Sequence, residues 1–250
     1  MNQIHKTAII GPDVLLGENN TIGAYVILDG KISIGNNNII GHNSVITNNV
    51  KIGNDNKIIG SASIGSLGEM GTKGDVFLED GSVIIGNNNV LREFITVNSP
   101  VRKKYTIIGD NCYLMARTHV PHDAELKNNV VMATNSLVGG GSIVNDYAYI
   151  GLGSITHQWV DIGESAMIGI QAAVTKFVPP FCTVTGIPAK ILKFNRTGAE
   201  RRGFDIDILD EVENNFKHII NGVYVSNNPI IIIINYFIKN NKDTLNSFVK

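Results

Sequence analysis

The chain has 250 residues and a formal net charge of −1 at pH 7, with a mass of 27.1 kDa and a pI of about 6.6. This length is sufficient for one or two domains with a buried core. The nearly neutral charge argues against a nucleic-acid-binding protein that works through bulk positive charge.

The N-terminus, the cysteines and the longest apolar run favour a cytoplasmic protein. No apolar stretch follows Lys6, so we expect no signal peptide. Cys112 and Cys182 lie far apart and fit no metal-ligand spacing, so we expect buried, reduced thiols and no metal site. The apolar run at 230–238 is interrupted by Asn235 and is shorter than the ~20 residues that a membrane span needs.

Aliphatic residues recur at every sixth position through most of the chain. Six is neither a helical period nor a strand alternation, but it fits a parallel β-helix of hexapeptides with three sides per circuit. Glycine and asparagine would occupy the corners, where left-handed backbone angles are needed. Thr156 alone breaks the last series, and the aliphatic positions are Ile10, Leu16, Ile22, Leu28, Ile34, Ile40, Ile46, Ile52, Ile58, Ile64, Ile85, Leu91, Val97, Ile108, Leu114, Val120, Leu126, Met132, Val138, Val144, Ile150, Ile162, Ile168 and Val174.

We expect the β-helix to occupy residues 1–180, with two interruptions at 66–82 and 98–107 that have no inward-facing rhythm. Loops on a rigid scaffold often carry binding residues, although a functionless insertion stays equally open. Val178-Pro179-Pro180 should end the repeat, because proline cannot donate to a strand ladder.

Residues 181–250 are predicted to form a connector and a small α-helical domain. Asp205 can cap a helix that ends at Asn221-Gly222, and further short helices should follow Pro229 and Lys242. The apolar face of the first helix would consist of Ile206, Leu209, Val212, Phe216, Ile219 and Ile220.

The stretch from Ile108 to Val160 holds the chemistry. His119-Val-Pro-His122-Asp123 is the one local cluster of groups able to move a proton, and a histidine suits a general base near neutrality. Residues 122, 140 and 158 are separated by eighteen and eighteen, so a circuit of eighteen residues would stack them on one wall. Pairing of His122 with Asp123 requires a corner there, because adjacent side chains of a regular strand point apart. The alternatives are that His122 is an ordinary polar residue, that the glycine run 139–141 only makes a tight turn, and that His119 is structural.

The chain resembles the UDP-N-acetylglucosamine O-acyltransferases of lipid A biosynthesis (the LpxA type). The features that carry the resemblance are the hexapeptides, His119-Val-Pro-His122-Asp123, Thr156-His157-Gln158, the Val178-Pro179-Pro180 exit and Gly198-Ala-Glu-Arg-Arg-Gly-Phe204. The resemblance covers nearly the whole chain. It implies a mainly β fold, a left-handed parallel β-helix, and a homotrimer with active sites between the prisms. It also implies transfer of a (3-hydroxy)acyl chain from acyl carrier protein to the 3-position of a UDP-N-acetylglucosamine-like sugar. No cofactor is implied beyond the phosphopantetheine that the donor carries.

The resemblance also implies roles for individual residues. His122 matches the general base, Asp123 its acidic partner and Gly140 the backbone N–H that binds the oxyanion. The residues that match substrate contacts are His157, Gln158, Asn195, Arg201 and Arg202, the two arginines holding phosphate. His119 is a further candidate for substrate binding, with a structural role as the equal alternative.

A run of basic residues lies near these arginines. Lys190, Lys193 and Arg196 belong to the same cluster, which in sequence is opposed only by Glu200 and would receive an acidic carrier protein. A solvated basic face is the alternative. The segment 186–190 resembles the pantetheine-binding end of acetyltransferases, which leaves the donor open between acyl carrier protein and coenzyme A.

The chain departs from the family pattern in three ways. Gly141 stands where a histidine usually follows the oxyanion glycine, and Glu69 and Lys73 are candidate substitutes for an acidic residue and a lysine in the first interruption. Ile170 stands where the family commonly has glycine at the far end of the acyl groove, so we expect a shorter acyl donor.

Other functions remain open at this stage. N-acylation of a nucleotide-linked amino sugar, as for an O-antigen or capsule, could use the same fold and base. A zinc-dependent hydratase would need more residues between paired ligands than His119-x-x-His122 provides. An ice-binding prism would show a ladder of threonines, which the sequence lacks.

Overall fold

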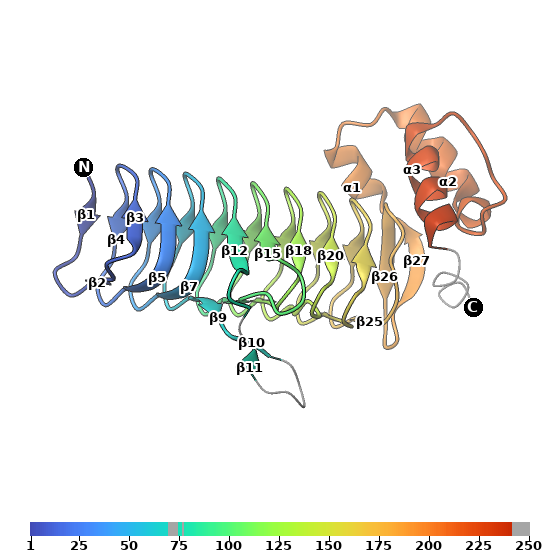
Figure 1. Cartoon of the computed structure of the whole chain (residues 1–250). Helices are drawn as coiled ribbons and strands as arrows, with labels where there is room; N and C mark the ends of the chain where they lie inside the picture. The colour runs from blue at the N-terminus through green and yellow to red at the C-terminus, as the bar shows by residue number, and fades with distance from the viewer. Residues whose placement is uncertain (70–74, 77, 242–250) are drawn as a thin grey trace.

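The computed structural model describes residues 1–69, 75–76 and 78–241 as a long three-sided prism that carries helices at its C-terminal end (Figure 1). One circuit of the prism takes 18 residues, as in the bond that Asp110 N–H donates to Asn128 Oδ1. The circuit that the repeat predicts is therefore confirmed. The circuits that hold the two interruptions are longer, with register steps of 33 and 23 residues.

The first wall is one sheet whose strands are parallel until the last pair. Its strands, in order, are β1 (Gln3–Ile4), β4 (Thr21–Ile22), β6 (Ile39–Ile40), β8 (Lys57–Ile58), β13 (Val90–Leu91), β16 (Tyr113–Leu114), β19 (Val131–Met132), β21 (Tyr149–Ile150), β24 (Met167–Ile168), β26 (Cys182–Thr185) and β27 (Lys190–Phe194). Parallel pairing thus continues past the prolines at 179–180 to Thr185, and the antiparallel β27 closes the sheet.

The second and third walls meet in the long strands β5 (Ile27–Ile34) and β7 (Val45–Ile52), which run round the corner between them. The second wall continues with β2 (Ile9–Ile10), β9 (Ser63–Ser66), β14 (Thr96–Asn98), β17 (His119–Val120), β22 (Ile155–Thr156) and β25 (Ala173–Val174). The third wall continues with β3 (Val14–Leu16), β12 (Ser82–Ile85), β15 (Tyr105–Ile108), β18 (Glu125–Leu126), β20 (Ile143–Val144) and β23 (Asp161–Ile162).

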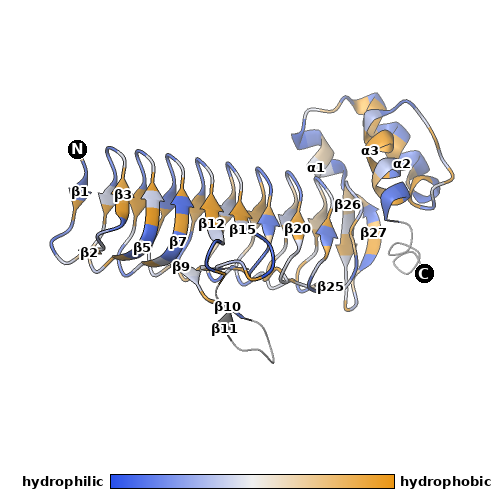
Figure 2. Ribbon diagram, in the orientation of Figure 1, coloured by the Kyte–Doolittle hydropathy of each residue, from blue (hydrophilic) through white to orange (hydrophobic). Residues whose placement is uncertain are grey.

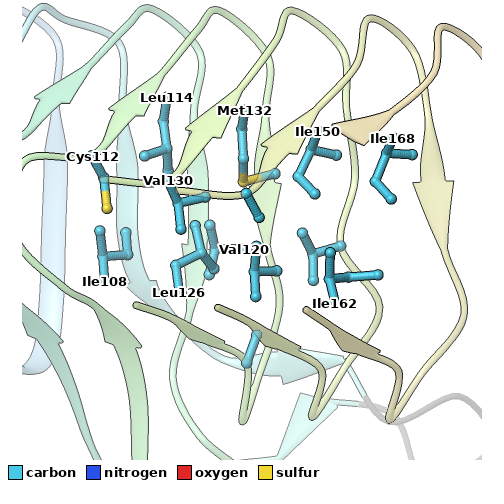
Figure 3. Close-up of a cluster of buried hydrophobic side chains, with 14 of the residues drawn as sticks. Ile108, Cys112, Leu114, Val120, Leu126, Val130, Met132, Ile150, Ile162 and Ile168 are labelled. Carbon is cyan, nitrogen blue, oxygen red and sulfur yellow. The ribbon is translucent and has the colours of Figure 1, made fainter. Parts of the chain in front are cut away.

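Columns of aliphatic side chains fill the prism. Leu114, Met132, Ile150 and Ile168 follow one another along the first wall, and each is fully buried (Figure 3). Hydropathy coloring shows the same alternation of apolar strands and polar corners along the prism (Figure 2). Burial of one such side chain contributes roughly 1.5–3 kcal/mol, so the periodic aliphatic residues fix the register of successive coils.

Asparagine has the corner role that the sequence predicts. Asn37 and Asn129 have φ of 59°, in the left-handed region. Buried asparagines also form a ladder between coils, as where Asn56 N–H donates to Asn38 Oδ1 at 2.9 Å. These bonds satisfy backbone groups that would otherwise be buried without partners.

The interruptions leave the prism next to each other in space. The first contains the antiparallel pair β10 (Gly68–Glu69) and β11 (Asp75–Val76). The second is shorter than predicted, because β15 already begins at Tyr105 and pairs with β12. Its irregular part is residues 99–104.

Three helices follow the prism: α1 (Arg196–Arg201), α2 (Ile206–Ile220) and α3 (Pro229–Asn240). The predicted helix from Asp205 to Asn221 is confirmed as α2, although the Asp205 side chain makes no capping bond and Ile206 is exposed. The helix predicted after Pro229 is α3, and the one predicted after Lys242 lies outside the described residues. The division at residue 180 remains a prediction. In the ranges that the structure describes, none of the helices has the length and apolar character of a membrane span.

Candidate active site

His122 and Asp123 form a buried pair at the corner between β17 and β18. Asp123 has φ of 64°, and this left-handed turn lets two adjacent side chains face each other. His122 Nδ1 lies 2.8 Å from Asp123 Oδ2. Asp123 is fully buried, while His122 keeps 6% of its surface exposed. The corner that their pairing requires is therefore present.

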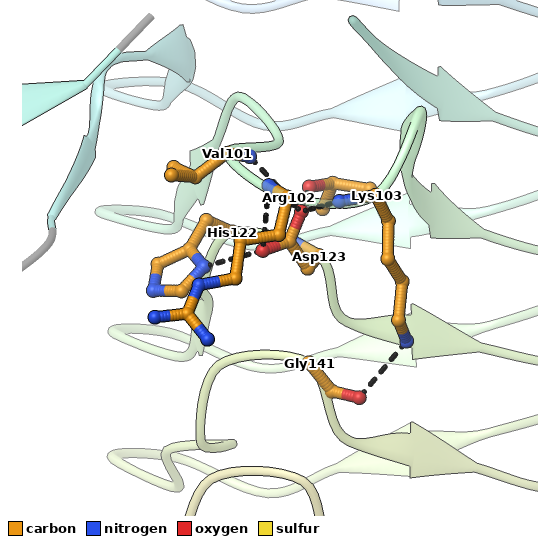
Figure 4. A network of polar contacts seen from close by, with 7 residues as sticks. Val101, Arg102, Lys103, His122, Asp123 and Gly141 are labelled. Atoms are coloured by element: carbon orange, nitrogen blue, oxygen red, sulfur yellow. Dashed lines mark hydrogen bonds and ion pairs between the residues drawn. The ribbon is translucent and has the colours of Figure 1, made fainter. Parts of the chain in front are cut away.

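Residues of the second interruption hold the carboxylate from the other side. Asp123 Oδ1 accepts backbone N–H bonds from Val101, Arg102 and Lys103 at 2.9, 3.0 and 2.8 Å (Figure 4). Burial by itself would raise the pKa of Asp123, but the bonds from His122 and from these N–H groups outweigh it and lower the pKa. Asp123 is thus a carboxylate at neutral pH, and it can hold a proton on His122 Nδ1 and leave Nε2 free to act as a base.

Gly140 packs directly against the imidazole on the next coil. A Cβ added to Gly140 would lie 2.7 Å from His122 Cε1 and 2.8 Å from Nε2, so no larger residue fits. The Gly140 carbonyl accepts from Trp159 N–H at 2.9 Å. No acceptor for Gly140 N–H is found among the described residues. A glycine that packs against Nε2 and has no acceptor for its N–H among the described residues is suited to an oxyanion site.

The three segments separated by eighteen residues stack on one another as predicted, although at a corner of the prism rather than on a wall. Gly141 N–H donates to the His122 carbonyl at 3.0 Å, which joins the first two coils. Trp159 N–H donates to the Gly140 carbonyl, which joins the third coil to the second. We call this edge, between the second and third walls, the site corner. His157 and Gln158 lie exposed on its third coil, with His157 Nδ1 3.2 Å from the Gln158 carbonyl.

His119 and Glu69 flank the site corner. His119 Nδ1 lies 2.7 Å from Thr96 Oγ1, a bond across the second wall. Burial lowers the pKa of His119, and the neighbouring Glu69 carboxylate opposes this shift. A Cβ added to Gly68 would lie 3.0 Å from His122 Cβ, so β10 runs beside the imidazole. Lys73 lies outside the described residues.

Other candidates lie on the opposite side of the prism. Ile170, Asn195, Arg201 and Arg202 line a groove of about 630 Å³ over the first wall. In a three-sided prism the first wall faces away from the corner where the other two walls meet. One chain therefore does not bring these residues to His122.

Two groove residues already have partners within the chain. Asn195 caps α1 by accepting from Gly198 N–H at 3.2 Å, and its Nδ2 donates to the Ser165 carbonyl at 2.8 Å. Arg202 donates to Glu164 at 3.2 Å, and its guanidinium lies 4.1 Å from the Tyr147 ring centre.

The basic cluster is weaker than the sequence suggests. Arg196 pairs not only with Glu200 but also with Asp210 at 2.8 Å and Glu213 at 2.6 Å, both on α2. Glu200 is the one acidic residue within 190–202, as the sequence shows, but α2 folds back beside α1 and adds two carboxylates from outside that stretch. In the described ranges, three cations of this region form no ion pair: Lys190, Lys193 and Arg201.

Sequence reasoning missed two features of the site corner. The irregular segment 99–104 supplies the N–H groups that hold Asp123, and only its place one coil before His122 could have suggested this. Trp159 stands over Gly141, where an added Cβ would meet its ring at 2.4 Å. Its position eighteen residues after Gly141 was a signal that could be read. In the portion of the chain described, no three His, Cys, Asp or Glu side chains are grouped to hold a metal ion.

Comparison with known proteins agrees with this geometry. A family model described as bacterial transferase hexapeptide (six repeats) matches residues 14–48 and 105–140, and one described as UDP N-acetylglucosamine O-acyltransferase, domain 2, matches residues 178–242. The acyl-[acyl-carrier-protein]–UDP-N-acetylglucosamine O-acyltransferase of Aliarcobacter butzleri is 37% identical over 100% of this chain and 93% of its own length. The chain belongs to this family.

A second relative and two solved structures extend the match. The enzyme of the same name from Herminiimonas arsenicoxydans is 37% identical, over 92% of this chain and 86% of its own. The structure of LpxA, a UDP-N-acetylglucosamine acyltransferase from Bacteroides fragilis, gives a TM-score of 0.89 at 31% identity, covering 95% of this chain and 97% of that one. The structure of the UDP-N-acetylglucosamine acyltransferase from Campylobacter jejuni gives a TM-score of 0.86 at 30% identity. The match covers 95% of this chain and 96% of that one. The expected fold class, a left-handed parallel β-helix followed by helices, is confirmed.

The hydrogen bonds to Asp123 lead to a prediction about stability. We expect Asp123→Asn to lower the free energy of unfolding by about 1.5–3 kcal/mol at pH 7, because an amide is a weaker acceptor for these N–H groups. The folded-state pKa of Asp123 is below its unfolded value, so this stability is present above the unfolded pKa of ~3.9 and is lost as the pH falls through the folded pKa. Urea unfolding from pH 7 to pH 3 should show the two curves converging. The exposed Asp13→Asn is the control, expected within about 0.5 kcal/mol of wild type.

Proposed function

We propose that this protein transfers an acyl chain from acyl carrier protein to the 3-hydroxyl of UDP-N-acetylglucosamine or a closely similar nucleotide sugar. The observation that carries the proposal is the site corner, where His122, oriented by Asp123, packs against Gly140, whose N–H has no acceptor among the described residues. The matched O-acyltransferases, at 34–42% identity, favour an ester product over the amide of an N-acyltransferase. We place the reaction in the cytoplasm, whose reducing conditions suit the two free buried cysteines.

The chemistry uses each group once. His122 Nε2 takes the proton of the sugar hydroxyl, and the oxygen of that hydroxyl forms a bond to the carbonyl carbon of the thioester. Asp123 stabilises the imidazolium through Nδ1, and Gly140 N–H binds the negative oxygen of the tetrahedral intermediate. When the C–S bond breaks, the imidazolium returns its proton to the leaving thiolate. No cofactor takes part beyond the phosphopantetheine of the donor.

We further propose that the active form is a homotrimer whose sites lie between neighbouring prisms. The groove with Asn195, Arg201 and Arg202 faces away from His122 of the same chain. A second copy packed against the site corner could supply these residues. Arg201 and Arg202 would then hold the nucleotide phosphates, while Gln158 and His157 contact the sugar nucleotide from the site corner, with His119 and Glu69 at its flank. Lys73 remains a candidate for the same role.

The general base gives the most direct test. We expect His122→Ala to lower kcat by about 10²–10⁴-fold, because the hydroxyl loses its proton acceptor. Product would be measured by mass spectrometry with acyl carrier protein thioester and UDP-N-acetylglucosamine. The exposed His5→Ala serves as the control, with an unchanged rate.

A rate for His122→Ala equal to wild type would end the base assignment. Treatment of the wild-type product with mild base then tests the bond: an ester is cleaved and an amide survives. A base-stable product from an amino-sugar acceptor would favour the N-acyltransferase.

Mixed oligomers test the shared site. We expect His122→Ala and Arg201→Ala each to be nearly inactive alone, and their co-expressed mixture to regain a measurable fraction of activity. The reason is that some interfaces would pair an intact His122 with an intact Arg201 of the neighbour. Light scattering would give the oligomeric state. A trimeric mixture that stays as inactive as its parents contradicts sites shared between chains.

The acyl-length prediction concerns Ile170, which is 66% exposed and lines the groove. We expect the wild type to prefer a shorter donor, and Ile170→Gly to shift the preference toward longer chains, because the side chain shortens the pocket. Competition between decanoyl and tetradecanoyl donors measures the shift. The prediction is wrong if the wild type prefers tetradecanoyl donors and Ile170→Gly changes nothing.

A further inference from the structure

The turn that carries the oxyanion donor is built from three consecutive glycines, Gly139–Gly141. Glycine gives such a segment more backbone freedom than any other residue, and Gly141 has φ of 72°. Yet Gly140 N–H has to keep its position beside His122, since a misplacement of ~1 Å can cost 10²-fold in rate. Contacts from outside the turn must therefore fix it.

Besides the internal bond from Ser142 N–H to the Gly139 carbonyl at 3.2 Å, four hydrogen bonds from outside hold the turn. Three come from neighbouring coils: Gly139 N–H to Thr156 Oγ1, Gly141 N–H to the His122 carbonyl, and Trp159 N–H to the Gly140 carbonyl. The fourth comes from the second interruption, where Lys103 Nζ donates to the Gly141 carbonyl at 3.0 Å (Figure 4). The same ammonium lies 5.3 Å from the centre of the Trp159 ring.

Lys103 also contacts the His122–Asp123 pair, through Asp123. Its backbone N–H donates to Asp123 Oδ1 at 2.8 Å, so one residue bonds both to the carboxylate that orients His122 and to the turn that presents Gly140. A charged donor to a carbonyl is stronger than a neutral one. No carboxylate pairs with Lys103 in the part of the chain that is described, so its ammonium is not drawn away from the turn.

We infer that Lys103 is a positioning residue, which fixes the oxyanion turn relative to the His122–Asp123 pair. This inference rests on the proposed acyl transfer and adds a residue that lies in the irregular segment 99–104. Lys103 acts through Gly141 rather than on the substrate, so its loss should affect the rate of the chemical step more than substrate binding.

The test compares Lys103→Met, which keeps the length of the side chain but removes the ammonium, with Lys103→Arg, which keeps a charged donor. Lys104→Met is the matched control, because Lys104 is exposed and its ammonium lies over the Tyr105 ring at 5.4 Å instead of on the turn. For Lys103→Met we expect kcat to fall about 10–100-fold, with KM for donor and acceptor changing less than about twofold. The kcat of Lys103→Arg should lie within about threefold of the wild-type value, and the kcat of Lys104→Met should equal the wild-type value.

Two readouts are independent of catalysis. Trp159 is the single tryptophan of the chain, so its fluorescence reports on this corner: the emission should shift in Lys103→Met and not in Lys104→Met. Amide hydrogen exchange of a peptide covering residues 137–143 should be faster in Lys103→Met. If Lys103→Met does not fold, Lys103→Gln replaces it in every measurement.

The outcomes separate this inference from the proposed function. A wild-type kcat in Lys103→Met, an equal loss in Lys104→Met, or a loss confined to KM would overturn the positioning role. If the wild-type protein transfers no acyl chain, the proposed function fails, and unchanged exchange at 137–143 in Lys103→Met would still overturn the role of Lys103 in fixing the turn.

Discussion

The burial of one aliphatic side chain at every sixth residue is the constraint on which this molecule depends. Each such residue packs on equivalents one coil before and one coil after, as Ile150 does between Met132 and Ile168 (Figure 3). A shift of one residue would turn the entire apolar set to the solvent, so the register is strongly specified. The chemical groups of the site corner inherit their spacing from this register.

The site corner lies where the regular hexapeptide repeat is interrupted locally. The left-handed conformation at Asp123 turns two adjacent side chains toward each other, which a strand would not allow. Placing a carboxylate in a fully buried position costs free energy, and the backbone N–H groups of 101–103 offset that cost. The interruption that looks dispensable in the sequence thus acts together with the bond from His122 to keep Asp123 ionised.

The opposite wall has a different character. Its groove contains the exposed Ile170 and cationic groups near α1, and much of the local charge is already paired, as for Arg196 with three carboxylates. A prism with candidate catalytic groups on one edge and candidate binding groups on the facing wall is suited to assembly with copies of itself. This arrangement is the physical basis for proposing sites between chains.

Much of the fold and of the site corner could be predicted from the sequence, because the spacing of residues in a repeat determines where they lie along and around the prism. The period of six predicts the prism, and the separations between residues 122, 140 and 158 predict that three coils stack, whereas their place at a corner came from the structure. The helix from 206 to 220 followed from its own apolar face and its terminal Asn221-Gly222.

Only the tertiary structure decided which contacts are made by the segments outside the repeat. Periodicity says nothing about where residues 99–104 fold, so the bonds of Val101, Arg102 and Lys103 to Asp123 could not be read from the sequence. The same holds for the pairing of Arg196 with α2, which depends on a chain reversal after Arg202. A repeat determines positions through local burial, whereas loops and helices are placed by contacts with distant residues that no local pattern encodes.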